Sequence, residues 1–319
     1  MAPHRRDLPG RLRAIRVALD TTPLVQTRAG TARYVNALRQ HLHPLEVSFP
    51  ATSRLRTAVA DTVWYPRLRA PRGADLLHCP TFRGPFRAHG PLVVTVHDLA
   101  VLRHPAWFNR WTASYSRYAV PRVVRAASRV IAVSEFTKRE LVSLLQLDPD
   151  VIRVVPNAVE DVFTPDGPRA DGDYVLAVGT LEPRKNLARI AQAVDGELRV
   201  VGARGWRSVT PPANVTRCEN VTDEELARLY RGARCLVYAS LYEGFGIPVA
   251  EALACGCPVV TSAGSPMAEL AGNDAVLVDP EDVASIREGI ARAPRPVPRR
   301  GPSWADVAAQ TRAVYEELA

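Results

Sequence analysis

Short apolar runs alternate with amphipathic stretches along most of the chain, which is the pattern that most constrains its fold. In the first part of the chain, strands are predicted at residues 16–20, 92–99, 130–133 and 152–155, and helices at 31–42 and 136–147. Ser134 stands where it can cap the helix that begins at Phe136. Strands that are apolar throughout and alternate with helices indicate a parallel sheet covered on both faces. The chain is therefore predicted to be α/β.

A second alternating series follows FTPDGPRADGD, a stretch rich in Pro, Gly and Asp that reads as a linker. The strands of this series are predicted at 174–179, 198–202, 235–239, 258–262 and 275–278, and the helices at 187–194, 223–231, 248–254 and 283–293. We expect two doubly wound, Rossmann-like domains, 1–165 and 172–300, that face a cleft at the carboxyl ends of their strands. A capped amphipathic helix is expected at 303–319, whereas 43–91 shows no clear periodicity.

The charge of the chain is uneven. The net charge is +8, but residues 1–165 hold 24 Lys and Arg against 12 Asp and Glu, and the remainder is net negative. A basic first domain suits an anionic partner such as a membrane surface. Its arginines are spread along the chain and not clustered, so no nucleic acid is expected. An aromatic stretch is predicted to form a helix face packed in the core, with membrane-surface contact as the alternative; it comprises Trp107, Phe108, Trp111, Tyr115 and Tyr118.

Several protein classes are not expected. No apolar run approaches the ~18 residues of a membrane span, and the basic N-terminus lacks the apolar stretch of a secretory signal. We therefore expect a cytoplasmic protein, with peripheral contact at the inner membrane face as a further option. The five cysteines have no framework spacing, and no cluster of metal ligands stands out, so no metal is expected.

The stretch SLYEGFGIPVAEALACGCPVV, residues 240–260, places two carboxylates around a glycine-rich turn. Pro248 suits the first turn of a helix, whose free N–H groups would face a ligand in front of it. Glu243 lies on the loop before that helix, and Glu251 lies about one turn inside it. A carboxylate can accept hydrogen bonds from two sugar hydroxyls, so Glu251 is predicted to bind a ribose diol. The alternative is a structural ion pair between Glu251 and an arginine.

Three further stretches place polar groups at strand ends. VGTLEPRKNL carries Arg184 and Lys185, which could clamp a diphosphate or could form a solvated loop pair. TVHDL ends a strand at His97, which could contact a substrate hydroxyl or could be structural, while Asp98 could orient the imidazole or cap the next turn. RAGTARY has Gly30 between the first strand and first helix, where a tight turn comes close to phosphate or sugar.

Together these stretches resemble those of one family. GTARY, VVTVHDL, RVIAVSEFTKREL, VLAVGTLEPRKNL and the E-x7-E segment EGFGIPVAE are similar to those of retaining, nucleotide-sugar-dependent glycosyltransferases of the GT-B fold, in glycosyltransferase family 4. The resemblance covers most of residues 16–319. It implies a GT-B fold in which the terminal helix crosses back onto the first domain and the first domain holds the acceptor. It also implies that no metal or other cofactor is needed.

The resemblance assigns a role to each motif residue. It implies that Arg184 and Lys185 hold the donor diphosphate and that Glu251 binds the nucleotide ribose. Glu243 is expected to contact hydroxyls of the transferred sugar, and His97 is expected to contact that sugar and support the transition state. The other donor-binding residues that it implies are Gly30 for the phosphates, Asn220 and Val221 for the base, Gly244, Phe245, Gly246 and Ile247 for the sugar, and Thr180.

The expected function is transfer of a hexosyl unit with retention, from GDP-mannose or a UDP-sugar to a hydroxyl of a glycan, a lipid-linked or a small-molecule acceptor. No carboxylate stands out as a nucleophile, which favours same-face attack. Two alternatives stay open. One is a catalytically inactive homologue that binds nucleotide-sugar or serves as a partner subunit, and the other is a GT-B epimerase.

Overall fold

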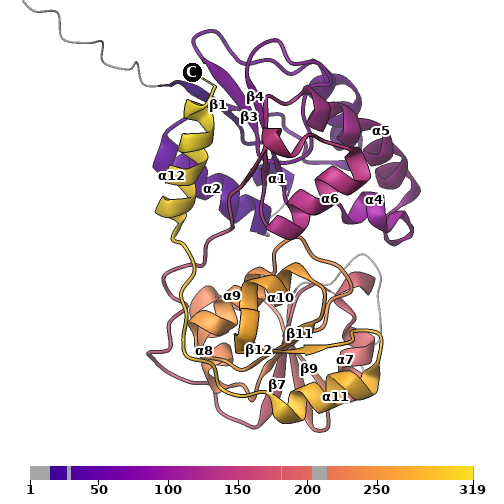
Figure 1. Ribbon diagram of the computed structural model, residues 1–319, viewed down its shortest axis with the longest axis vertical. Coiled ribbons are helices and arrows are strands. Elements are labelled where there is room, and N and C mark those ends of the chain that lie inside the picture. The colour runs from indigo at the N-terminus through magenta and orange to yellow at the C-terminus, as the bar shows by residue number, and fades with distance from the viewer. Residues whose placement is uncertain (1–14, 27–29, 181, 203–213, 319) are drawn as a thin grey trace, which may run out of the picture.

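The computed structural model describes residues 15–26, 30–180, 182–202 and 214–318. These residues form two six-stranded parallel sheets, one in each half of the chain. Helices cover the faces of both sheets, and the two α/β units lie one above the other in Figure 1. The predicted pair of doubly wound domains is therefore confirmed.

The first sheet has the strand order β2-β1-β3-β4-β5-β6, and the second has the order β12-β11-β10-β7-β8-β9. The strands of the first sheet are β1 Val17–Asp20, β2 Leu45–Val47, β3 Leu76–Cys79, β4 Leu92–Val96, β5 Arg129–Ala132 and β6 Ile152–Val154. Those of the second sheet are β7 Tyr174–Val178, β8 Glu197–Val201, β9 Val215–Cys218, β10 Leu236–Tyr238, β11 Val259–Ser262 and β12 Ala275–Val278. In each sheet the strands that come next in the chain lie on one side of the first strand, β1 or β7, and the later strands lie on its other side.

The α-helices follow the alternation read from the sequence. In the first domain they are α1 Pro23–Gln26, α2 Gly30–Leu42, α3 Arg54–Val59, α4 Ala100–Arg103, α5 Arg110–Ala126 and α6 Glu135–Leu145. In the second domain they are α7 Leu187–Ala193, α8 Asp223–Gly232, α9 Ile247–Ala254, α10 Pro266–Ala271 and α11 Val283–Arg292, and the chain ends with α12 Trp304–Glu316. Ser134 caps α6 as predicted, because its side chain accepts a hydrogen bond from the Thr137 N–H.

The structure adds elements that the periodicity did not reveal. The unassigned region 43–91 contains β2, α3 and β3, and the second domain adds β9 and α10. β2 and β9 are edge strands of three and four residues with exposed or half-buried side chains. Such short edge strands lack the continuous apolar run of a central strand, so no pattern marks them in the sequence.

Helix α12 returns to the first domain, as expected from the family resemblance. It packs beside α2 in Figure 1, and its buried Val307, Val314 and Tyr315 belong to the same apolar cluster as Tyr34 and Leu38. The Tyr315 hydroxyl is 2.7 Å from Nδ1 of His78, a fully buried residue of β3. The terminal segment therefore completes the core of the domain that begins the chain.

The prediction that the aromatic stretch forms a helix face packed in the core is wrong, because Trp107 and Phe108 precede α5 and none of the five side chains is fully buried. Trp111 and Tyr118 of α5 are 53% and 52% exposed. The buried face of this helix instead carries small and β-branched residues, including Ala119, Val120 and Val124. These side chains allow the helix to lie close to the sheet, so the bulky rings turn outward. No helix among the described residues, α5 included, is long and apolar enough to cross a membrane.

Candidate active site

The strand order of the second sheet brings two loops from distant parts of the sequence together. β7 lies between β8 and β10, so the chain segments that leave β7 and β10 emerge side by side. The place where the strand order reverses is the switch point of the sheet. Doubly wound sheets bind ligands at this switch point, outside the carboxyl ends of the strands. The first segment leads through a short 3-10 turn, Pro183–Lys185, and the second carries residues 239–246.

Glu243 forms the centre of a buried ion cluster between these two loops. Its carboxylate accepts from Lys185 Nζ at 2.6 Å and from Arg184 Nη1 at 2.8 Å. Lys185 also donates to the Tyr238 hydroxyl, and the Arg184 Nε donates to Glu182 at 2.8 Å. The sequence placed Arg184 and Lys185 at a strand end and Glu243 on the loop before a helix, but only the fold joins both cations to the same glutamate.

The environment keeps Glu243 ionised. Burial alone would raise the pKa of its carboxyl group, but Lys185 and Arg184 hold that pKa below its ordinary value. Burial lowers the pKa of the Lys185 ammonium, and Glu243 opposes this shift. Two cations beside one switch-point loop can attract and stabilise a polyanionic group such as a diphosphate.

Glu251 belongs to a second cluster that spans the two domains. Its side chain is 4% exposed, and Oε2 accepts a hydrogen bond from the Tyr230 hydroxyl at 2.9 Å. Oε1 lies 3.4 Å from Nη1 of Arg33, which comes from α2 in the first domain. The same guanidinium forms an ion pair with Asp223, the first residue of α8. The ion pair considered as an alternative for Glu251 is thus present.

Burial raises the pKa of Glu251 to about 7, although Arg33 and the Tyr230 hydroxyl oppose the shift. The buried carboxyl group is therefore close to its titration point at neutral pH. Its affinity for hydroxyl donors depends on whether it carries the negative charge, because an ionised acceptor forms the stronger hydrogen bond.

His97 follows β4 in the first domain. Its Nε2 lies 3.0 Å from the carbonyl oxygen of Pro80, so Nε2 carries the hydrogen and donates it. Burial lowers the pKa of His97, which leaves the ring neutral and Nδ1 free to accept. Asp98 caps the next turn by accepting from the Ala100 N–H at 3.0 Å, which was one of its two predicted roles.

The glycine-rich turn between the two glutamates is packed tightly against the first domain. A Cβ atom on Gly244 would lie 1.7 Å from the carbonyl oxygen of His97, so no larger residue fits without movement. Gly246 has φ +99°, a left-handed conformation, and forms the N-cap of α9. A Cβ on Gly30 would lie 3.1 Å from the Ile247 side chain, so the start of α2 also meets this turn.

The remaining predicted donor-binding residues are Thr180, Phe245, Asn220 and Val221. The Thr180 hydroxyl donates to Glu182 at 2.5 Å, within the loop of Arg184. Phe245 is buried in the second-domain core, so only its backbone can face a ligand. Asn220 and Val221 line a hollow of about 310 Å³ with residues of α8, next to the capping residue of that helix.

Sequence reasoning missed several residues that contact the predicted ones. Arg33 lies in the quoted GTARY stretch, but nothing in the sequence connects it with Glu251. The other missed contacts are Asp223, Tyr230, Tyr238 and Thr137. All of them act on residues that are distant in sequence, so no local pattern could identify them.

Comparison with known families supports the grouping of these motifs. A family model described as Glycosyltransferase Family 4 matches residues 16–189, more than half of the chain. The chain belongs to glycosyltransferase family 4. A second model, Glycosyl transferases group 1, matches residues 160–295 and thus covers most of the second domain.

Relatives of this family 4 chain include two mannosyltransferases. The O-antigen chain mannosyltransferase B of Escherichia coli is 29% identical over 73% of this chain and 67% of its own length. The MMP alpha-(1->4)-mannosyltransferase of Mycolicibacterium hassiacum is 29% identical over 71% of this chain and 65% of its own length. The chain thus spans about two thirds of the length of these relatives.

Solved structures show the same GT-B fold as this family 4 chain. Sucrose-phosphate synthase from Thermosynechococcus elongatus has a TM-score of 0.71 at 18% identity, with 95% of this chain and 99% of that chain covered. Anabaena Alr3699/HepE in complex with UDP-glucose has a TM-score of 0.69 at 15% identity, with the same coverage. The predicted GT-B architecture is therefore confirmed.

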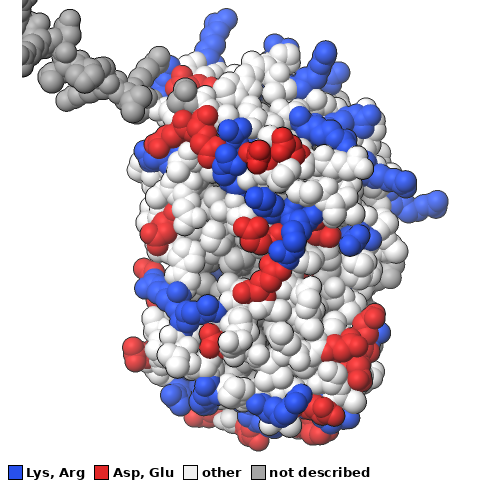
Figure 2. Space-filling model, in the orientation of Figure 1, with Lys and Arg blue, Asp and Glu red and all other residues white. Residues whose placement is uncertain are grey.

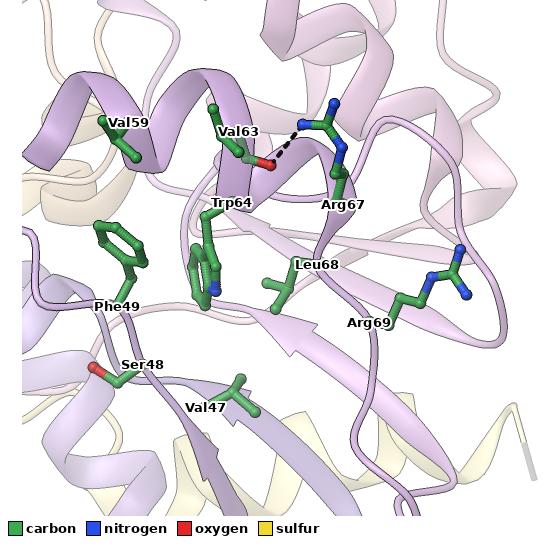
Figure 3. Close-up of a pocket in the computed structure, with 9 residues that line it drawn as sticks. All are labelled: Val47, Ser48, Phe49, Val59, Val63, Trp64, Arg67, Leu68 and Arg69. Carbon is green, nitrogen blue, oxygen red and sulfur yellow. Dashed lines mark hydrogen bonds between the residues drawn. The ribbon is translucent and has the colours of Figure 1, made fainter.

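The region 43–91, which the motifs do not explain, forms an apolar groove in the first domain of the family 4 chain. Figure 3 shows Val47, Phe49, Val59, Trp64 and Leu68 around this hollow of about 690 Å³. None of the predicted donor-binding residues lines it. Within the described ranges, no group of three or more His, Cys, Asp or Glu side chains is arranged to hold a metal ion.

Proposed function

We propose that this protein is a retaining hexosyltransferase that moves a sugar from a nucleotide-sugar to an acceptor hydroxyl. The observation that carries the proposal is the ion cluster of Arg184, Lys185 and Glu243 at the switch point of the second sheet, in a chain of glycosyltransferase family 4. GDP-mannose is the preferred donor, because both the E. coli and the M. hassiacum relatives are named as mannosyltransferases, and UDP-sugars come next.

In the proposed reaction the acceptor oxygen forms a bond to the anomeric carbon on the face from which the diphosphate leaves. The bond between that carbon and the phosphate oxygen breaks, and its electron pair stays on the diphosphate. Arg184 and Lys185 stabilise the negative charge that grows there. The acceptor hydroxyl gives its proton to the leaving phosphate, so the step is balanced without a metal ion or another cofactor.

Three residues support the sugar and the nucleotide in this proposal. Glu243 accepts hydrogen bonds from hydroxyls of the transferred sugar, and Glu251 accepts them from the ribose diol. His97 is neutral, and its unprotonated Nδ1 can accept from a sugar hydroxyl. The acceptor is a glycan, a lipid-linked or a small-molecule hydroxyl, bound by the first domain.

We further propose that the protein works in the cytoplasm, with peripheral contact at the inner membrane face. Helix α5 supports this, because it exposes Trp111 and Tyr118 and has four arginines but no acidic residue. The Tyr115 hydroxyl donates to the Asp61 carbonyl at 2.7 Å and so joins α5 to the segment that carries exposed Val59 and Val63. Figure 2 shows Lys and Arg side chains without acidic neighbours along the upper right edge of the first domain. Arginine interleaved with apolar side chains suits an anionic lipid surface.

The test is nucleotide release from GDP-mannose, UDP-glucose and ADP-glucose, each with and without a panel of sugar and lipid-linked acceptors. We expect release of one nucleotide that increases with acceptor, and a product whose anomeric configuration by NMR equals that of the donor. Turnover is expected to persist in EDTA. Binding without turnover would favour the inactive homologue, and conversion of the nucleotide-sugar without an acceptor would favour the epimerase.

A further inference from the structure

Helix α6 of the first domain and its N-cap residue contact both neighbours of Glu243, namely the backbone of Gly244 and the side chain of Tyr242. The carbonyl oxygen of Gly244, which follows Glu243, accepts from Ser134 Oγ at 2.6 Å and from Thr137 Oγ1 at 3.1 Å. The hydroxyl of Tyr242, which precedes Glu243, donates to Glu140 at 3.2 Å. One helix of the first domain therefore contacts both neighbours of a residue in the second domain.

Two of these three contacts are buried, and the hydrogen bond from Ser134 is partly buried. Thr137 is 1% exposed, and Glu140 and Tyr242 are both 7% exposed. Gly244 lies so close to the His97 carbonyl that it cannot carry a Cβ atom. The Gly244 carbonyl has two donors at this tightly packed position, so the loss of Ser134 would leave it with the weaker, longer hydrogen bond from Thr137.

The Glu243 carboxylate itself is held from the other side, by Lys185 and Arg184 of the second domain. The side chain of Glu243 is thus held by one domain, and its two neighbours in the chain are held by the other. The position of its carboxylate relative to His97 depends on the hydrogen bonds to α6.

We propose that Ser134 is a positioning residue that sets the Glu243 loop against His97 when the two domains are closed. Its hydroxyl hydrogen goes to the Gly244 carbonyl, and its lone pair accepts from the Thr137 N–H at 3.0 Å. The hydroxyl of Ser134 contacts Gly244 and Thr137, so in this proposal it acts through the loop. The inference rests on the proposed function, in which Glu243 and His97 serve the same sugar.

The two hydrogen bonds of Ser134 can be separated by substitution. Ser134→Asp keeps an acceptor for the helix cap but has no hydrogen to donate, and its carboxylate repels the Gly244 carbonyl. Thr137→Val removes the second donor without a change of shape. Asn109→Asp is the matched control, because Asn109 caps α5 in the same way and the change also adds one negative charge at a helix N-terminus.

The experiment measures kcat and KM for nucleotide release from the reactive donor, the Kd of its nucleoside diphosphate by calorimetry, and Tm. For Ser134→Asp we expect kcat to fall by about 30-fold or more, because a small misplacement at a reacting centre is costly. Kd should stay within about threefold and Tm near that of wild type, since the nucleotide residues and the cap remain. Thr137→Val should lower kcat by a smaller factor, and Asn109→Asp should leave it unchanged.

The proposal is overturned if Ser134→Asp keeps kcat within about threefold of wild type. It is also overturned if kcat and Tm both fall and Kd rises in this variant. Absence of turnover in the wild-type protein would instead count against the proposed function. The inference can then still be decided by small-angle X-ray scattering of the empty protein. Loss of the interdomain hydrogen bond should increase the radius of gyration of Ser134→Asp relative to wild type and Asn109→Asp, and an unchanged radius would refute it.

Discussion

Arg33 in the first domain forms an ion pair with Glu251 in the second, with 3.4 Å between Nη1 and Oε1. The predicted ribose-binding carboxylate therefore has a partner in the other domain. Because Asp223 shares the same guanidinium, Arg33 keeps a partner if ribose hydroxyls replace it at Glu251. The ion pair and the ribose site are thus compatible, and the following predictions separate their effects.

Nucleotide binding should depend on pH through Glu251. Its pKa is raised to about 7 by burial, so the carboxyl group gains a proton as the pH falls through 7 and becomes a weaker acceptor for ribose hydroxyls. Calorimetry between pH 5.5 and 8.5 should show Kd rising toward low pH in wild type and a flatter profile in Glu251→Gln. A wild-type profile as flat as that of the variant would exclude Glu251 from the nucleotide site.

The raised pKa of Glu251 also affects protein stability, which should increase toward low pH, where nucleotide binding becomes weaker. The folded protein binds the Glu251 proton more tightly than the unfolded chain, for which the pKa is near 4.5. This group therefore contributes a free energy of unfolding that decreases as the pH rises from about 4.5 to 7. Denaturant unfolding across this pH range should show a smaller decrease in the free energy of unfolding for Glu251→Gln than for wild type. Equal dependence of this free energy on pH in the two proteins would contradict the raised pKa of Glu251.

Removal of Arg33 should move the pH profile of nucleotide binding. Arg33 lowers the pKa of Glu251, so Arg33→Ala should raise the pH at the midpoint of the nucleotide-binding profile by about one pH unit. Arg39→Ala is the control, because Arg39 lies on the same helix and pairs with Glu46 in an exposed position. The interdomain role is disproved if both variants keep the wild-type midpoint.

Lys185→Met should lower turnover more than nucleotide affinity. The substitution removes one of two cations that would stabilise the leaving diphosphate, an effect of about 100-fold or more on kcat. It also leaves the buried Glu243 with Arg184 as its remaining cation, so Tm should fall. Steady-state kinetics and thermal unfolding measure both effects, with Arg287→Ala, at an exposed ion pair, as control. Wild-type kcat in Lys185→Met would rule out this role.

Gly244→Ala should separate the domains and abolish activity. The added methyl group would collide with the His97 carbonyl, which directly follows the buried strand β4. Nucleotide binding should be weakened less than turnover. Gly90→Ala is the control, because a Cβ there meets nothing within 4 Å. Crystals of an active Gly244→Ala protein with unchanged domain contacts would contradict this prediction.

Vesicle binding should depend on the exposed rings of α5. Sedimentation with phosphatidylglycerol vesicles should retain wild-type protein and lose it in 0.5 M salt, whereas phosphatidylcholine vesicles should not retain it. The double variant Trp111→Ser and Tyr118→Ser should bind several-fold less. Val297→Ser, an 80% exposed site outside the first domain, should bind like wild type. Equal retention of all three proteins would remove the proposed membrane surface.

The sequence by itself determined the architecture and the position of the charged loops along it. Alternating apolar and amphipathic segments are local features, because a strand or a helix face is set by residues a few positions apart. They sufficed for most strands of both parallel sheets, for the cap at Ser134, for Lys185 after the end of a strand and for Glu243 on the loop before a helix, but not for β2, β3 and β9.

Only the tertiary structure decided which charges become partners and which faces are buried. Arg33 and Glu251 are 218 residues apart, and Ser134 meets Gly244 across the domain interface. The aromatic spacing of α5 was compatible with a core face, but the closer packing of Ala119 and Val120 turned Trp111 outward. Such choices depend on how two domains fit together in space, and local periodicity contains no information about that fit.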